Sequence, residues 1–75
     1  MKTTYVFSYE NADWDESDDL AVEQLEQMGA EVNPYDWDDD LRRYVVVVTT
    51  TLNSLSVFKF SGKHWEYETD YPVDN

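Results

Sequence analysis

A run of β-branched residues near the middle of the chain constrains the fold most. Residues 42–51 read RRYVVVVTTT, and such a concentration of valine and threonine strongly favours an extended strand. An unbroken apolar run, without alternation of apolar and polar residues, is typical of a strand that is buried on both faces. We therefore expect this strand in the interior of a sheet. If it lay at an edge instead, its free backbone groups would allow a second copy to pair with it as a homodimer.

Three other segments are also predicted to be strands. Residues 3–9 (TTYVFSY) alternate aromatic with smaller side chains, which indicates a first strand with one aromatic face. Turn signals at 53–54 and 61–62 separate residues 55–60 from residues 63–69. Both of these segments are predicted to be strands joined by a hairpin turn.

One helix is predicted between the first strand and the valine-rich strand. Asp15 and Ser17 are both candidate N-caps, and Gly29 is the expected residue just beyond the helix end. At 100° per residue the apolar side chains share one face, and an acidic stripe lies roughly opposite. No Lys or Arg occurs between Lys2 and Arg42. The acidic stripe is therefore uncompensated, although a solvated helix usually interleaves lysines there.

The remaining segments are expected to be irregular. Residues 30–41 are predicted to be a loop with a turn at Asn33–Pro34 and room for a short strand before it. The tail at 70–75 is expected to be frayed. We therefore predict one acidic domain over residues 1–75 with an α+β fold, in which one helix packs on a four-stranded, mainly antiparallel sheet (β-α-β-β-β).

The chain is strongly acidic. Seventeen Asp and Glu against five Lys and Arg give a net charge of -12, while 41% hydrophobic and 16% aromatic residues argue against plain disorder. The absence of cysteine excludes disulfides and thiolate metal clusters. The sequence has no signal-peptide pattern and no apolar stretch of about 20 residues. We expect a cytoplasmic protein that binds neither membranes nor, because phosphates would repel it, nucleic acid.

The residue patterns offer little support for a catalytic or metal site. Asp36, Asp38 and Asp40 match positions 1, 3 and 5 of a calcium-binding EF-hand loop. Position 6 is Leu41 where the loop needs Gly, and position 12 is Val47 where it needs Glu. The single histidine cannot form a zinc-binding cluster. Carboxylates for acid–base chemistry are plentiful, but so short a chain has hardly enough core to enclose a pocket. We expect no enzymatic activity, metal or cofactor.

Tryptophan occurs twice among aspartates, in DWDE at 13–16 and DWDD at 36–39. One interpretation is that each ring packs over an end of the core, with Trp14 fixing the start of the helix. The other is an aromatic anchor ringed by carboxylates, which would hold a partner's arginine by stacking and ion pairing. The sequence leaves both interpretations open.

The acid excess has three explanations. Solubility rarely needs a net charge above about 8 in magnitude on a small domain. Adaptation to high salt would also fit the low lysine content. We favour complementarity to a basic protein, because the acids cluster in three runs. A charge of -12 equals that on about 20 Å of duplex DNA.

In size, charge, lack of cysteine and the runs DWDESDD and DWDDD, the chain resembles a class of small acidic proteins of phages and mobile elements, the anti-CRISPR and anti-restriction DNA mimics. The resemblance implies a non-enzymatic inhibitor in the host-cell cytoplasm that blocks the basic nucleic-acid-binding surface of a CRISPR-Cas effector, a restriction nuclease or a similar protein. The alternatives are an immunity or antitoxin protein that neutralises a basic toxin, and a phage protein that binds host RNA polymerase. The residues expected to contact the partner are Asp13, Trp14, Asp15, Glu16, Asp18, Asp19, Glu23, Glu26, Asp36, Trp37, Asp38, Asp39 and Asp40.

Overall fold

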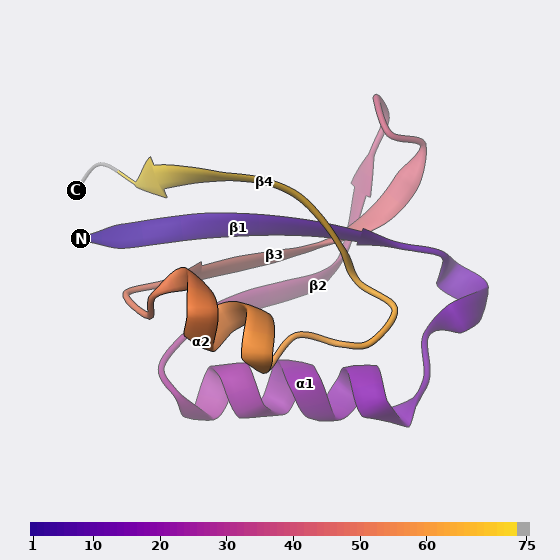
Figure 1. Ribbon diagram of the computed structural model, residues 1–75. Helices are drawn as coiled ribbons and strands as arrows, with labels where there is room; N and C mark the ends of the chain where they lie inside the picture. The colour runs from indigo at the N-terminus through magenta and orange to yellow at the C-terminus, as the bar shows by residue number, and fades with distance from the viewer. Residues whose placement is uncertain (74–75) are drawn as a thin grey trace.

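The computed structural model describes residues 1–73, which form a four-stranded sheet with its helices packed on one face (Figure 1). The elements in chain order are β1 (Lys2–Tyr9), the 3-10 turn η1 (Asn11–Asp13), α1 (Glu16–Gln27), β2 (Glu31–Asp38), β3 (Arg43–Thr50), α2 (Ser54–Lys59) and β4 (Glu66–Val73). All neighbouring strands are antiparallel, in the order β2-β3-β1-β4. The predicted α+β class, with one main helix on a four-stranded antiparallel sheet, is confirmed.

A second, short helix makes the predicted β-α-β-β-β order only approximate. With α2 included, the elements run β-α-β-β-α-β, the sequence found in ferredoxin-like arrangements. The valine-rich strand β3 lies between β2 and β1, so its predicted interior position is confirmed. The edge strands are β2 and β4, and β3 therefore has no free edge with which to pair with a second copy.

The core lies between the sheet and the two helices. Alternate side chains of β1 and β3 point to this side, because successive residues of a strand face opposite ways. Leu25 of α1 and Val57 of α2 are fully buried against them. Burial of each such side chain contributes about 1.5 to 3 kcal/mol. The core cluster consists of Tyr5, Phe7, Tyr9, Ala21, Leu25, Ala30, Val46, Val48, Val57 and Trp65.

Both ends of α1 are where the sequence places them. Asp15 is the N-cap: it accepts a hydrogen bond from the backbone N–H of Ser17 at 2.8 Å, and the buried Asp18 carboxylate accepts from the N–H of Asp15 at 2.9 Å. This reciprocal capping box satisfies N–H groups that a helix start leaves without partners. Gly29 ends the helix with a φ of +91°, which glycine adopts without steric cost.

The loop prediction for residues 30–41 is wrong over most of its length, because Glu31–Asp38 forms the strand β2. Asn33 and Pro34 do not make a turn there. They lie at a register shift in the pairing with β3, between Asn33 and Asp36. An edge strand tolerates proline because one side of its backbone needs no ladder partner. The Pro34 carbonyl accepts a hydrogen bond from the Tyr9 hydroxyl at 2.7 Å.

The predicted strand at 55–60 is a helix. Asn53 is its N-cap and accepts a hydrogen bond from the N–H of Ser56 at 2.9 Å, so the apparent turn signal is a helix start. The expected hairpin at 61–62 is therefore also wrong. A loop that includes the buried Gly62 leads instead into β4. Asp70–Val73 belong to β4, so this part of the tail is not frayed, and residues 74–75 lie outside the described residues.

Candidate acidic interaction surface

The Trp14 ring packs over one end of the core. Its centroid lies 4.7 Å from that of Tyr9, and it stacks nearly parallel to Trp65 at 6.1 Å. The indole Nε1 donates a hydrogen bond to Asp19 at 3.0 Å. Trp14 thereby joins the start of α1 to the core, which is the first of the two interpretations that the sequence allows.

Trp37 lies at the surface of the β2–β3 hairpin. It is 50% exposed, its ring packs edge-on against Tyr44 at 5.1 Å, and its Nε1 donates to Asp39 at 2.8 Å. Tyr35, two residues earlier on β2, is 59% exposed, and its ring lies 5.4 Å from that of Trp14. The hairpin thus presents an indole face among carboxylates, as the second interpretation requires. The two similar Trp motifs therefore have different environments.

Most of the predicted contact residues have no cationic partner within the described chain. The ion pairs among residues 1–73 join Lys2 to Glu31, Arg43 to Glu10 and Glu66, and His64 to Asp15. None of these ion pairs involves a carboxylate of the acidic stripe on α1 or of residues 36–40. We call the eight carboxylates of these two groups the acidic side: Glu16, Asp19, Glu23, Glu26, Asp36, Asp38, Asp39 and Asp40.

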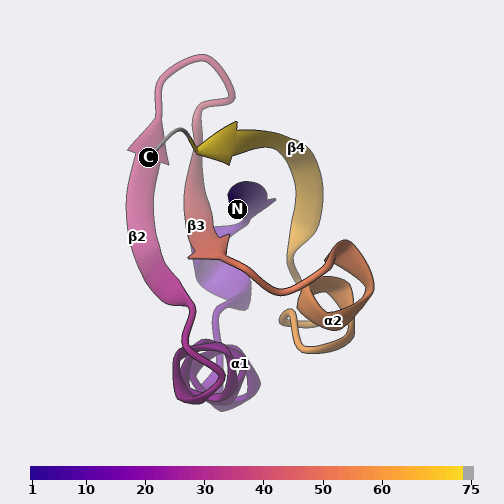
Figure 2. The same ribbon diagram turned by 90° about the vertical axis from the view of Figure 1, so that its left-hand side faces the viewer.

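The acidic side runs from one layer of the molecule to the other. Figure 2 shows α1, β2 and the hairpin loop following one another along one side, with α2 on the opposite side. Lys59 and Lys63 lie at the end of α2 and just after it, where they line an open hollow together with Ser17, Leu20 and Gln24 of α1. Arg42 is the one cation of the hairpin loop. The carboxylates of Glu66, Glu68 and Asp70 lie apart, on β4 at the other edge of the sheet.

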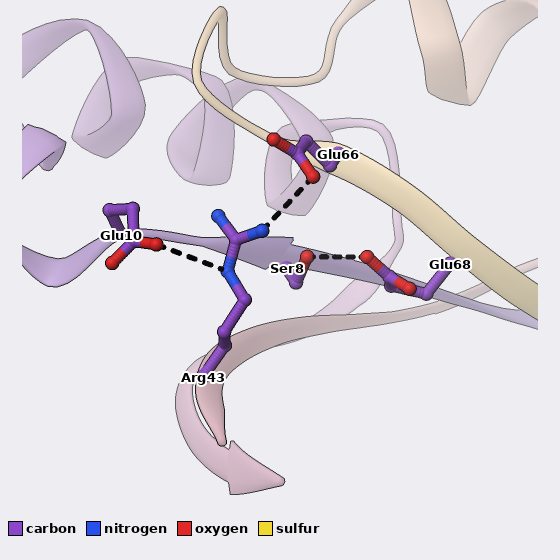
Figure 3. A network of polar contacts seen from close by, with 5 residues as sticks. All are labelled: Ser8, Glu10, Arg43, Glu66 and Glu68. Carbon is purple, nitrogen blue, oxygen red and sulfur yellow. Dashed lines mark hydrogen bonds and ion pairs between the residues drawn. The ribbon is translucent and has the colours of Figure 1, made fainter. Parts of the chain in front are cut away.

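Acids near the ends of β1 and β4 serve the fold. Arg43 lies 3.8 Å from Glu10 and 3.0 Å from Glu66, and Ser8 donates to Glu68 at 2.6 Å (Figure 3). Only 22% of the Arg43 side chain is exposed. These contacts join three strands across the sheet face that lies opposite the helices. The carboxylates of Glu10 and Glu66 are therefore less available to a partner than those of the acidic side.

The same sheet face is hollowed into an open groove of about 510 Å³. Its floor is apolar and consists of Val6, Val45 and Val47 on the two central strands. The β2–β3 hairpin forms one wall and β4 the other. Figure 2 shows the sheet curling between these strands. We call this hollow the sheet groove. Its lining residues are Val6, Asp36, Trp37, Asp38, Asp40, Leu41, Val45, Val47, Glu68, Thr69 and Tyr71.

Sequence reasoning missed the sheet groove and with it Leu41, Val47 and Tyr71. The alternate valines of the central strand could have indicated it, because a strand with apolar side chains on both faces needs something to cover each face. The loop prediction for residues 30–41 removed one wall of the groove. No local pattern indicates a wall built from strands far apart in sequence.

A second cluster of polar groups lies at the start of α1. Asp15, Asp18 and His64 each place one possible ligand atom within 4.8 Å of the others. Hydrogen bonds from the Ser17 hydroxyl and backbone, in that order, hold the pKa of Asp15 below its usual value. Both aspartates accept the capping hydrogen bonds described above, so their first role is to begin the helix. Asp18 is fully buried and does not reach the surface, and Asp13 is exposed on η1.

Comparison with protein-family models, with curated protein sequences and with solved structures gives no significant match. No helix within residues 1–73 is long and apolar enough to cross a membrane. The case for a function therefore depends on the geometry described above.

Proposed function

We propose that this protein is a non-enzymatic inhibitor that binds the basic nucleic-acid-binding surface of another protein and excludes nucleic acid from it. The resemblance in the sequence to anti-defence DNA mimics suggests a CRISPR-Cas effector or a restriction nuclease as the target, in the cytoplasm of a host cell. The acidic side is the surface that would occupy the target's phosphate-binding residues.

The observation that carries the proposal is the set of eight carboxylates on α1 and on the β2–β3 hairpin that form no ion pair within residues 1–73. Carboxylates that only maintain solubility are usually interspersed with cations, because like charges on one helix face destabilise it. Here Lys59 and Lys63 form no ion pair with these carboxylates. The net charge of -12 is spread over a longest dimension of 33 Å, whereas duplex DNA carries the same charge on about 20 Å. The charge spacing is therefore of the same order as in DNA, but wider.

Charge of this kind acts first on association. A concentrated negative surface steers a basic partner into contact and repels acidic proteins. Exposed ion pairs contribute only about 0.2 to 1 kcal/mol each, so the affinity would come from many of them together. The inhibitor therefore needs no pocket and no catalytic residue.

The test starts with the immobilised protein, which captures partners from a host lysate at low salt. The affinity of the captured partner is then measured for a variant that carries Glu23→Gln, Glu26→Gln and Asp40→Asn. These three carboxylates accept no hydrogen bond from residues 1–73, so the fold should persist. Asp38 is less suitable, because it accepts from the N–H groups of Asp40 and Leu41 and so shapes the hairpin.

The matched control adds the same three units of charge on the opposite side, as Thr51→Lys, Ser54→Lys and Leu55→Lys. All three of these residues are exposed. We expect the first variant to weaken binding by about tenfold or more, at roughly 0.5 kcal/mol per contact, and the control by much less. Equal losses would show that net charge alone matters and would contradict the role of the acidic side.

The exposed aromatic residues support a second candidate, an immunity or antitoxin protein. Such an inhibitor would depend on Trp37 and Tyr35 as anchors that fill pockets of one toxin. Trp14 packs on the core and is not available for this role. Trp37→Ala would then cost about 2 kcal/mol or more, while the charge variant would cost little. Competition with DNA for the captured partner separates DNA mimicry from binding to another basic surface, such as one on RNA polymerase.

A further inference from the structure

We infer that the sheet groove is a docking site for an arginine-containing extended segment of the partner protein. The inference rests on the proposed function, since it names the chemistry by which a basic partner is recognised. It places a recognition site on the concave face of the sheet, in the layer opposite to α1.

The first argument is the apolar floor. Both helices lie on the other face of the sheet, so nothing within residues 1–73 covers Val6 and Val47, which stay partly exposed. Leu41 at the hairpin tip and Tyr71 on β4 add apolar surface to the two walls, and each is at least one-third exposed. A ligand that covered these side chains would gain free energy in proportion to the apolar area removed from water. The occupant must therefore carry aliphatic groups.

The second argument is the charge of the walls. Asp36, Asp38 and Asp40 line one wall and Glu68 the other, and no Lys or Arg lines the groove. None of these four carboxylates belongs to an ion pair. Glu68 accepts from Ser8 through one oxygen, which leaves its other oxygen free for a ligand. The occupant must therefore also be cationic.

Arginine meets both demands. Its aliphatic stem can lie along the valines while its charged end reaches the carboxylates. The planar guanidinium can bind two carboxylate oxygens at once, which an ammonium group does less well. A volume of about 510 Å³ holds a few side chains and not a whole domain, so the occupant is a short segment.

The inference can be tested without the natural partner. The probe is the peptide acetyl-Leu-Arg-Leu-Arg-amide, titrated into the labelled protein and followed by NMR through backbone amide shifts. We expect the largest shifts at Val6, Val45 and Val47 and small ones along α1. The same peptide with citrulline in place of arginine keeps the shape and removes the charge. We expect it to bind at least about tenfold more weakly, as loss of a charge-assisted hydrogen bond implies.

Two neutralised variants locate the site. Asp36→Asn with Glu68→Gln removes two charges from the groove and keeps their acceptor oxygens, and we expect a loss of about tenfold in peptide affinity. Glu23→Gln with Glu26→Gln removes the same charge from α1, and we expect a loss of less than about threefold, as for distant surface charges. Val47→Lys places a cationic side chain on the groove floor and should abolish peptide binding. The neutralised pairs still decide the matter if that variant does not fold.

The outcomes separate this inference from the proposed function. If both neutralised pairs weaken the peptide equally, or if the shifts follow α1, the groove is not the docking site. The acidic side could still bind a basic partner in that case. If the groove variants alone lose the peptide while the partner's affinity depends only on the α1 acids, the groove binds arginine but does not serve the inhibitor. Equal binding of arginine and citrulline peptides would overturn the inference outright.

Discussion

At Gly62 the chain passes so close to the start of α1 that no side chain fits. A Cβ placed there would overlap the Asp18 carboxylate and the Trp65 indole. The Asp18 Oδ1 and Trp65 Nε1 atoms are both buried and have no hydrogen-bond partner within residues 1–73. The absence of a side chain at residue 62 is what lets these two polar groups lie together beneath the loop.

We therefore predict that Gly62→Ala lowers the free energy of unfolding by about 3 kcal/mol, as overpacking of a filled site does. Gly29→Ala is the matched control. A Cβ there meets no atom within 4 Å, and only the φ of +91° opposes it, at a cost of about 1 kcal/mol. Urea unfolding of both variants measures the difference. A smaller effect at Gly62 than at Gly29 would contradict the packing described here.

Tyr9 gives a prediction about alkaline pH. Burial, followed by the nearby Tyr35, Tyr44 and Asp18, raises its pKa from the ordinary 10.0 to about 12. The native state therefore keeps the hydroxyl proton that the unfolded chain loses, so the contribution of Tyr9 to stability is complete below pH 10 and is lost between pH 10 and pH 12.

The comparison is with Tyr9→Phe, which lacks both the titrating group and the hydrogen bond to Pro34. We expect the variant to be less stable at pH 8 by about 1 kcal/mol. The gap to the parent protein should narrow as the pH rises above 10. Denaturant unfolding at a series of pH values measures it, and a gap that stays constant up to pH 12 would be inconsistent with a buried, protonated tyrosine.

Among the elements, α1 owes its start to Asp15. Asp15→Ala should cost about 1 kcal/mol, whereas Asp15→Asn, which is as good an N-cap, should cost much less. The hydrogen bonds from Ser17 lower the pKa of Asp15, so its contribution is present above the unfolded value of 3.8 and is lost as the pH falls below it. Stability of the Ala variant should therefore depend less on acid pH than that of the parent. Equal acid dependence would argue against the cap.

Elements with strong local signals could be predicted from the sequence. The valine run, the alternation in β1, and the Asp15 and Gly29 boundaries of α1 all have local physical causes. Two of the errors, the loop at 30–41 and the strand at 55–60, came from residues whose preference is shared between structures. Asn53 favours turns and helix N-caps equally, and Pro34 is excluded from central strands but tolerated at an edge. Only the tertiary position of each segment decides between these alternatives.

For the whole molecule, the sequence predicted clusters of acids but not their arrangement. The position of the hairpin acids relative to those of α1 depends on which edge β2 occupies, and the sheet groove depends on the curl of four strands. Asp18 lies in an acidic run, which indicated a surface role. Its side chain is instead buried and belongs to the capping box of α1. Charge patterns along the chain thus identify candidate residues, and the fold selects among them.

The most direct test of the proposed function is the salt dependence of binding to the captured partner, measured together with displacement by duplex DNA. If about eight carboxylates replace phosphates, affinity should fall by roughly 10³-fold or more between 50 and 200 mM salt, and DNA should compete for the same surface. The variant Glu23→Gln, Glu26→Gln, Asp40→Asn should show a shallower dependence. An affinity that changes less than about tenfold over this range, or a partner that holds DNA and this protein together, would contradict mimicry of nucleic acid.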